Sequence, residues 1–216
     1  MIKYSGLILI VFVFLFKSAS GQTSVDSILL NKNYFSLDEA LKSPTQVYRL
    51  DLSNQTAQVS DAVLSKFPNL QYLSLKNDHL KQIPSSVGNL VNLKVLDLSG
   101  NDFEVLPSNF VNLVNLQELY LNDDKYMNFE KNIPILSELP NLTSLHIEND
   151  GLKSLPKNLY MLSHIESLYL NNNQFKVIPK ELLDLENLQY IDLHGNQFNL
   201  PSQESQHQSL RFRIRF

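Results

Sequence analysis

Three aromatic side chains recur at nearly equal intervals in the middle of the chain: Tyr120, His146 and Tyr169, separated by 26 and 23 residues. Acidic residues extend this spacing, because Asp97 lies 23 residues before Tyr120 and Asp192 lies 23 residues after Tyr169. Rings and carboxylates on one face offer apolar area together with hydrogen-bonding groups, a combination typical of adaptable binding surfaces. The spacing predicts that one repeated element places these side chains in a row.

Paired carboxylates such as Asp97 and Glu118 would also suit a glycosidase, in which one acid protonates the leaving group and the other acts as nucleophile or base. Such a site must exclude water and raise the pKa of one carboxyl group. The sequence shows no nucleophile, base and orienting residue in a common pattern. The absence of cysteine excludes thiol catalysis and thiolate metal sites. We therefore expect no enzymatic activity and no cofactor, and the glycosidase remains an alternative.

A divalent cation site is a second alternative. Asp124 and Asp150 lie 26 residues apart, and Asp123 and Glu148 stand beside them. Carboxylates bind such cations, but aspartate also suits tight turns without any ligand. The five histidines are scattered. No metal site is predicted.

Residues 1–21 have the order of a secretory signal peptide. Lys3 stands near the start, an unbroken apolar stretch runs from Leu7 to Phe16, and the small residues Ala19-Ser20-Gly21 follow. This stretch is about half the length that a bilayer-spanning helix needs. The sequence predicts a secreted, periplasmic or cell-surface protein whose mature chain starts near Gln22 and has no membrane span.

Charge bears on the choice of partner. Removing Lys3 and Lys17 from the 18 basic residues leaves 16 against 22 acidic residues, a net charge of −6. A net negative chain disfavours binding to phosphate backbones, so nucleic acid is not an expected partner. Without cysteine, the protein must be stabilised by packing and hydrogen bonds alone.

A repeat positions the aromatic row. Seven strings carry apolar residues at offsets 0, 3 and 5, and they begin at intervals of 23, 23, 23, 26, 23 and 23 residues. Each string from Leu70 onward is followed by an Ile-Pro or Leu-Pro pair, the first at Ile83-Pro84 and the sixth at Leu200-Pro201. The strings are VYRLDL from Val47, LQYLSL from Leu70, LKVLDL from Leu93, LQELYL from Leu116, LTSLHI from Leu142, IESLYL from Ile165 and LQYIDL from Leu188.

The three apolar positions of each string point inward if a short strand follows a bend, and the residue between the last two then points outward. One coil buries little by itself, whereas stacked coils share a core. Burying an aliphatic side chain contributes roughly 1.5–3 kcal/mol, and ordering a residue costs about 1–2 kcal/mol. Stability is therefore collective, and we expect one dry interior in which equivalent side chains are superposed: Leu75, Leu98, Leu121 and Leu170.

The unit LxxLxLxxNxL followed by LPxxLxxLxx resembles the leucine-rich repeat family, and its seven copies cover about 155 residues. The resemblance implies an α/β fold: a right-handed solenoid with a parallel β-sheet on the concave face and short helical or 3₁₀ segments on the convex face. It also implies recognition of proteins. The pattern is similar to small secreted bacterial members, and to Ras-pathway scaffolds and plant resistance proteins. Missing cysteines distinguish the chain from animal extracellular members and favour a bacterial origin.

The ends of a stack need different sequences, because they expose apolar surface and strand edges. Ser36 and Glu39 have the spacing of a capping box, which predicts a short helix over the first coil. The last residues, 211–216, alternate arginine with apolar residues, which predicts a closing strand with Phe212 and Ile214 inward and the arginines outward. We expect a signal peptide at 1–21, a capping helix segment at 22–46, seven repeats at 47–200 and a C-terminal cap at 201–216.

The ninth position of the family motif is normally asparagine, whose amide both donates and accepts and can link successive coils. Asn101, Asn173 and Asn196 match. An ionised aspartate only accepts. We therefore expect weaker hydrogen bonding between successive coils where the sequence departs from the motif, at Gln55, Asp78, Asp124 and Asp150.

One repeat is longer than the others, with an insertion at about 126–130. Tyr126 takes the place at which other repeats bury Leu80, Phe103 or Phe175, so we expect the residues after it, Met127 to Glu130, to bulge from the loop next to the aromatic row. Loops of this kind often carry recognition, but a small change of loop length also costs little. The insertion is either part of a site or a tolerated change.

The outward side chains define a candidate ligand-binding surface centred on Tyr120, His146 and Tyr169. Tyrosine at an outward position can also reflect β-propensity alone. We expect a monomeric, non-catalytic secreted binding module with a protein partner, or alternatively a glycan. A cytosolic scaffold with a misread leader is the other alternative. The candidate residues are Tyr120, His146, Tyr169, Tyr72, Tyr190, Glu118, Asp97 and Phe129.

Overall fold

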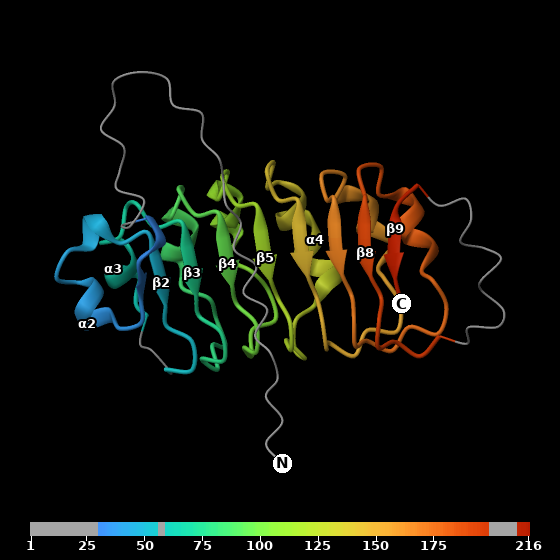
Figure 1. Ribbon diagram of the computed structural model, residues 1–216, viewed down its shortest axis with the longest axis horizontal. Coiled ribbons are helices and arrows are strands. Elements are labelled where there is room, and N and C mark those ends of the chain that lie inside the picture. The colour runs from blue at the N-terminus through green and yellow to red at the C-terminus, as the bar shows by residue number, and fades with distance from the viewer. Residues whose placement is uncertain (1–29, 56–58, 199–210) are drawn as a thin grey trace, which may run out of the picture.

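The computed structural model describes residues 30–55, 59–198 and 211–216, so the predicted signal peptide lies outside the described residues. Figure 1 shows the strands side by side in chain order, with short helical segments behind them. All strands of the described part pair in parallel with their neighbours in the sequence, which gives a single sheet ordered from β1 to β9. This is the predicted α/β solenoid.

Strands β2 to β8 fall inside the seven predicted strings, and each spans three residues. They begin at the same offset of every string, so the repeat fixes the register. The strands are β1 (Asn33–Tyr34), β2 (Arg49–Asp51), β3 (Tyr72–Ser74), β4 (Val95–Asp97), β5 (Glu118–Tyr120), β6 (Ser144–His146), β7 (Ser167–Tyr169), β8 (Tyr190–Asp192) and β9 (Arg213–Arg215).

The convex side consists of short helices. In four repeats a 3₁₀ helix starts directly after a proline, whose fixed φ and missing N–H suit a helix start, and its third residue is buried: Val87, Phe110, Leu159 or Leu182. The segments are α2 (Leu37–Ala40), η1 (Pro44–Gln46), α3 (Asp61–Leu64), η2 (Ser85–Asn89), η3 (Ser108–Asn112), α4 (Phe129–Ser137), η4 (Lys157–Met161) and η5 (Lys180–Asp184).

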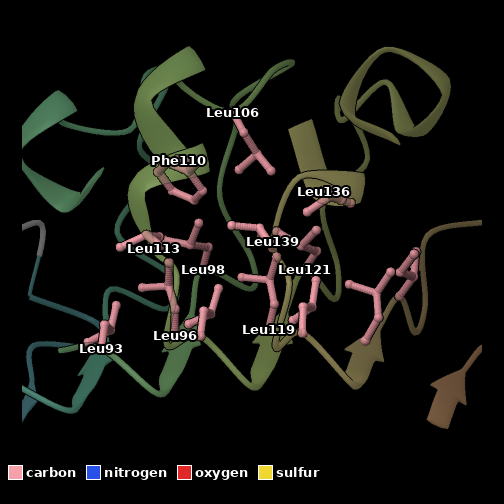
Figure 2. Close-up of a cluster of buried hydrophobic side chains, with 14 of the residues drawn as sticks. Leu93, Leu96, Leu98, Leu106, Phe110, Leu113, Leu119, Leu121, Leu136 and Leu139 are labelled. Atoms are coloured by element: carbon pink, nitrogen blue, oxygen red, sulfur yellow. The ribbon is translucent and has the colours of Figure 1, made fainter. Parts of the chain in front are cut away.

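The interior is one continuous apolar cluster. Strand pairing sets Leu96 opposite Leu119 and Leu119 opposite Leu145, so equivalent leucines stack from coil to coil. The predicted superposed set, Leu75, Leu98, Leu121 and Leu170, is fully buried. In Figure 2 the leucines of the strands point toward Phe110, Leu136 and other residues of the convex side. The predicted single continuous interior is confirmed.

The bend that follows each strand needs a left-handed backbone. One equivalent position has φ between 57° and 70° in seven successive repeats, and only Asn, Asp or Gly stands there. These residue types tolerate this region best. At Gly100 a Cβ atom would lie 1.9 Å from Asn77 Oδ1, so a larger residue there would require the Asn77 side chain to move. The positions are Asn54, Asn77, Gly100, Asp123, Asn149, Asn172 and Gly195.

Asparagines link the coils in two rows. In the predicted row, Asn173 Oδ1 accepts from the backbone N–H groups of Asp150 and Leu152, and its Nδ2 donates to the Ile147 and Leu170 carbonyls. A second row was not predicted, although an asparagine stands directly before the first leucine of several strings. Each donates its Nδ2 to a carbonyl of the preceding repeat at 2.7–2.9 Å: Asn69, Asn92, Asn115, Asn141 and Asn187.

The N-terminal cap differs from the prediction. Helix α2 begins after Ser36 as expected, but the Ser36 side chain makes no capping hydrogen bond. Glu39 pairs instead with Lys32, with 3.4 Å between Oε1 and Nζ, so the predicted capping box is wrong. Strand β1 was not predicted, because two residues are too short to show alternation. It pairs with β2 and buries Tyr34 over the first coil.

At the other end, β9 continues the sheet in register with β8 and buries Phe212, as predicted. Two of the outward arginines also bond the preceding coil. Arg211 donates to the backbone carbonyls of Leu183 and Leu185, and Arg215 pairs with Asp192 at 3.1 Å. The last strand is therefore fastened to the preceding coil by its charged side chains.

The insertion forms α4 on the convex side, and the predicted bulge is wrong. Tyr126 is 67% exposed, whereas Phe129 is 5% exposed and packs in the core with Ile133 and Leu136. These residues have the spacing of one helix face. The extra residues allow a helix to start at Asn128, whose Oδ1 accepts from the Lys131 N–H.

Pro134 lies inside α4, where its ring nitrogen cannot donate to the Glu130 carbonyl. Asn158 Nδ2 of the next repeat donates to this carbonyl at 3.1 Å. On the other side, the fully buried Asn132 accepts from the Leu106 N–H and donates to the Glu104 carbonyl. The insertion is thus bonded to both neighbouring repeats.

Candidate functional site

The predicted row forms on the concave side of the sheet. Pairing of β4 to β8 sets Asp97 opposite Tyr120, Tyr120 opposite His146, His146 opposite Tyr169 and Tyr169 opposite Asp192. Adjacent parallel strands lie about 4.8 Å apart, so rings on neighbouring strands can touch. The extra residues before β6 do not disturb this pairing.

The three rings stack on one another. The Tyr120 and His146 centroids lie 3.9 Å apart at an interplanar angle of 18°, and those of His146 and Tyr169 lie 4.0 Å apart at 3°. Tyr190 adjoins the stack, tilted against Tyr169 at 5.7 Å. His146 is only 7% exposed, because both of its faces are covered. It therefore supports the two tyrosines more than it contacts solvent.

Two carboxylates hold the buried imidazole at its edges. His146 Nε2 lies 3.0 Å from Glu118 Oε1, and Nδ1 lies 3.3 Å from Glu148 Oε1. Both ring nitrogens can donate only in the imidazolium form. The geometry thus favours a charged histidine between two tyrosine rings, which also gain a cation–π attraction.

The titration properties of the cluster follow from these contacts. Burial lowers the pKa of His146, but the hydrogen bonds to Glu118 and Glu148 outweigh it and raise the pKa above its usual 6.5. Burial raises the pKa of both carboxyl groups, yet the bonds to His146 hold it below the usual value. Burial and the bond to Glu118 raise the pKa of Tyr120 far above its usual range.

Further hydrogen bonds fix the two carboxylates. Tyr120 Oη donates to Glu118 Oε1 at 2.7 Å, and Asn171 Nδ2 donates to Glu148 Oε2 at 3.2 Å. Strand alternation places Glu148 outward on this face, but sequence reasoning did not include it among the candidate ligand-binding residues. Its position two residues after His146, outward on the same face, was the available signal. We call Tyr120, His146, Tyr169, Glu118 and Glu148 the aromatic–acid cluster.

The cluster is bounded differently on its two sides. Toward the C-terminus, Asp192 is 3% exposed and bonded to His194 Nδ1 at 2.7 Å and to Arg215 at 3.1 Å. Toward the N-terminus, Asp97 separates the cluster from Tyr72, whose ring lies under the Arg49 guanidinium at 4.2 Å. Burial and the nearby Asp51 and Asp97 raise the pKa of Tyr72 to about 12.

The structure brings most of the predicted residues together. Tyr120, His146, Tyr169 and Glu118 are in contact, Tyr190 and Asp97 adjoin them, and Tyr72 lies apart. Phe129 does not belong to this surface, because it is buried in α4 on the convex side. An open depression of about 500 Å³ lies over the row, and its lining includes Tyr120, His146, Tyr169, Asp97 and Asn122.

The acidic group proposed as a cation site is not supported. Among residues 30–55, 59–198 and 211–216, no three histidine or acidic side chains are placed to hold a metal ion. Within the same ranges, no helix combines the length and apolar character required to cross a bilayer.

Comparisons with solved structures support the fold. A leucine-rich repeat protein of Leptospira interrogans matches with 26% identity and a TM-score of 0.53, over 78% of this chain and 54% of that one. Internalin C2 from Listeria monocytogenes matches with 25% identity and a TM-score of 0.53, over 78% of this chain and 68% of that one. This chain therefore spans about half the length of the Leptospira protein.

Two matched structures are described as complexes. The TLR13–ssRNA13 complex matches with 26% identity and a TM-score of 0.62, over 84% of this chain and 28% of that one. The Toll–Spatzle complex from Drosophila matches with a TM-score of 0.64 over 75% of this chain and 22% of that one, and at 18% identity this likeness concerns the fold alone. The search of curated proteins gave no match.

Family models agree with the repeat pattern. A model described as leucine-rich repeat region matches residues 25–155, and one described as leucine rich repeat matches residues 140–198. The first match alone covers more than half of the chain. The chain belongs to the leucine-rich repeat family.

Proposed function

We propose that this chain is a non-catalytic binding module that captures a protein on its concave face, at the aromatic–acid cluster. The observation that carries the proposal is the stack of Tyr120, His146 and Tyr169, held at its edges by Glu118 and Glu148. These side chains are already ordered without a ligand, so binding would cost little side-chain entropy. Tyrosines in a well-packed centre are also typical of binding hot spots.

A protein fits this surface better than a glycan. A sugar ring usually packs on the open face of an aromatic ring, whereas both faces of His146 and one face of each flanking tyrosine are covered. The cluster instead presents carboxylates, a phenol and neighbouring amides such as Asn122 and Asn171. Such groups match the polar backbone and side chains of a protein surface.

Nucleic acid is not excluded by the fold, because the matched TLR13 structure is described as an RNA complex. The carboxylates of the cluster disfavour a phosphate backbone, so our proposal keeps a protein as the partner. Catalysis is not part of the proposal, because the depression is open and offers no means of excluding water.

Export is the second element of the proposal, and it rests on the leader pattern of residues 1–21. A mature N-terminus near Gln22 on protein recovered outside the cytoplasm is the expected result. An intact leader on protein from the soluble cytosolic fraction would favour the alternative of an intracellular scaffold.

Photo-crosslinking tests the binding surface. A photoreactive amino acid at Asn122, which lines the depression, should capture a partner in cells that express the full chain, and one at the exposed convex Val91 should not. The Tyr120→Ala/Tyr169→Ala double variant should lose the captured protein.

The matched control is the Tyr126→Ala/Tyr160→Ala double variant, which removes two tyrosines that are 67% and 60% exposed but lie off the concave face. It should retain capture. Equal capture by all variants, or capture through Val91 alone, would show that the surface is wrongly placed. A captured glycan or RNA would replace the proposed partner class.

A further inference from the structure

The ninth motif position forms a row of side chains that link successive coils, which we call the asparagine ladder. Asp124 and Asp150 stand in this row, between Asn101 and Asn173. At Asn101, Oδ1 accepts from the Leu80 N–H at 3.0 Å, and Nδ2 donates to the carbonyls of Leu75 and Leu98 at 2.9 and 2.6 Å. Asn196 makes the same three kinds of bond. The ladder position therefore requires one accepting atom and one donating atom.

Asp124 and Asp150 fulfil only the accepting half. Asp124 Oδ1 accepts from the Asn101 N–H, and Asp150 Oδ1 accepts from the Asp124 N–H, both at 2.7 Å. The Oδ2 atoms of both residues are buried and have no hydrogen-bond partner, and Asp124 as a whole is 1% exposed. In the asparagines this second atom is the donating Nδ2.

The repeat identifies the carbonyls that the second atom should meet. An asparagine bonds the carbonyl three residues before it and the equivalent carbonyl one coil earlier. For Asp124 these are Leu121 and Leu98, and for Asp150 they are Ile147 and Leu121. The carbonyls of Leu98 and Ile147 each accept a hydrogen bond from an asparagine. The two side chains that should bond the Leu121 carbonyl are both aspartates, Asp124 and Asp150. An ionised oxygen there would be repelled by the carbonyl, but a protonated one could donate to it.

The surroundings also oppose ionisation. The charged groups that act on Asp124 are Asp97 on the preceding coil, Asp123 beside it and Asp150 on the following coil. Asp150 faces Asp123 and Glu148. Burial, reinforced by these acids, raises the pKa of Asp124 to about 8 and that of Asp150 to about 7, although backbone N–H bonds oppose the shift.

We propose that Asp124 and Asp150 remain protonated in the folded protein near neutral pH and serve as hydrogen-bond donors of the ladder. The central coils then take up protons as they fold. Unfolded aspartate titrates near 3.9, so the stabilisation is complete below that pH and is lost as the pH rises through about 7 and 8. Since Leu121 directly follows Tyr120, alkaline pH would loosen the coil that carries the candidate site.

Thermal unfolding of the full chain at pH 5 and pH 8.5 tests this inference. The melting temperature of the wild type should fall by about 5 °C or more between these conditions. The Asp124→Asn/Asp150→Asn variant, which restores the family residue, should lose most of this fall and melt above the wild type at pH 8.5. Asp123→Asn is the matched control, because asparagine occupies the equivalent left-handed position in other repeats. It should leave most of the pH dependence in place.

A pH dependence of the Asn/Asn variant equal to that of the wild type would overturn the inference. Infrared spectroscopy provides a measurement that does not depend on the stability of any variant. The folded wild type at pH 6.5 should show the carbonyl stretch of protonated carboxylic acid, which disappears on titration above pH 9. Absence of this band at pH 6.5 would show that both aspartates are ionised and would equally overturn the inference.

Discussion

Two irregular features meet at the repeat that contains Tyr120, and they have opposite characters. On the concave side, the aromatic–acid cluster exposes polar edges and carboxylates around the buried ring of His146. On the convex side, the insertion forms α4, which buries Phe129, Ile133 and Leu136. The sequence pattern suggested that both belong to one recognition surface. The structure separates them by the thickness of the solenoid, so the cluster is a candidate for binding and the insertion is part of the scaffold.

The largest expected effect comes from the core of the insertion. Phe129→Ala should lower the free energy of unfolding by about 3–5 kcal/mol, because it leaves a cavity under α4. Tyr126→Ala, three residues earlier and mostly exposed, should change it by less than about 0.5 kcal/mol. Urea denaturation measures both. Comparable losses in the two variants would contradict the assignment of Phe129 as the core residue.

A smaller loss is expected for the polar anchor of α4. Asn132→Ala should cost about 2–3 kcal/mol, because it leaves the buried Leu106 N–H without a partner and removes one of the two donors to the Glu104 carbonyl. Asn128→Ala, which removes only the helix cap, should cost about 1 kcal/mol. If Asn132→Ala unfolds at the wild-type urea midpoint, the Asn132 hydrogen bonds do not stabilise the insertion.

Substitutions in the aromatic–acid cluster should mainly change the pKa of His146. The folded pKa of His146 is raised, so its contribution to stability is complete below about 6.5 and is lost as the pH rises through the folded value. Glu118→Gln should lower the His146 pKa, since it replaces a carboxylate by a neutral amide. NMR titration of the imidazole resonances measures this, and Glu104→Gln on the convex side should have no effect.

The smallest effect should come from the phenol of the stack. Tyr120→Phe keeps the ring on His146 but removes the donor to Glu118, so we expect a loss of about 0.5–1.5 kcal/mol in chemical denaturation. Partner capture should weaken in this variant if the ordered carboxylate is part of the contact. An unchanged stability together with unchanged capture would reduce the role of Glu118 to that of a counter-ion for His146.

Sequence reasoning recovered the periodic part of the molecule. Strands, inward leucines and the row of Tyr120, His146 and Tyr169 follow from side-chain alternation in a fixed register, which needs no knowledge of neighbouring coils. The stacking of His146 and its two hydrogen bonds could not be predicted in this way. They depend on side-chain rotamers and on Glu148, which lies on the same face two residues after His146.

The helix in the insertion was not predicted, because Pro134 belongs to two sequence patterns that indicate different structures. Ile133-Pro134 matches the pair that precedes a 3₁₀ helix in other repeats, so a helix start after Pro134 was the natural interpretation. The spacing of Phe129, Ile133 and Leu136, which indicates an α-helix that includes the proline, was therefore overlooked. The Asn128 cap was the available signal for a helix that begins earlier. Ser36 shows the reverse error, since a good capping pattern was read as a hydrogen bond that the structure does not form.

The unbroken pairing of β5 with β6 across the insertion has an evolutionary consequence. Glu118 stays opposite Ser144 although the chain between them is three residues longer than in other repeats. Residues can thus be gained on the outer arc of a coil without shifting any side chain on the inner one. Selection can therefore vary the length of a coil and the side chains of its inner surface independently. A repeat can become longer while the inner surface of its neighbours stays unchanged.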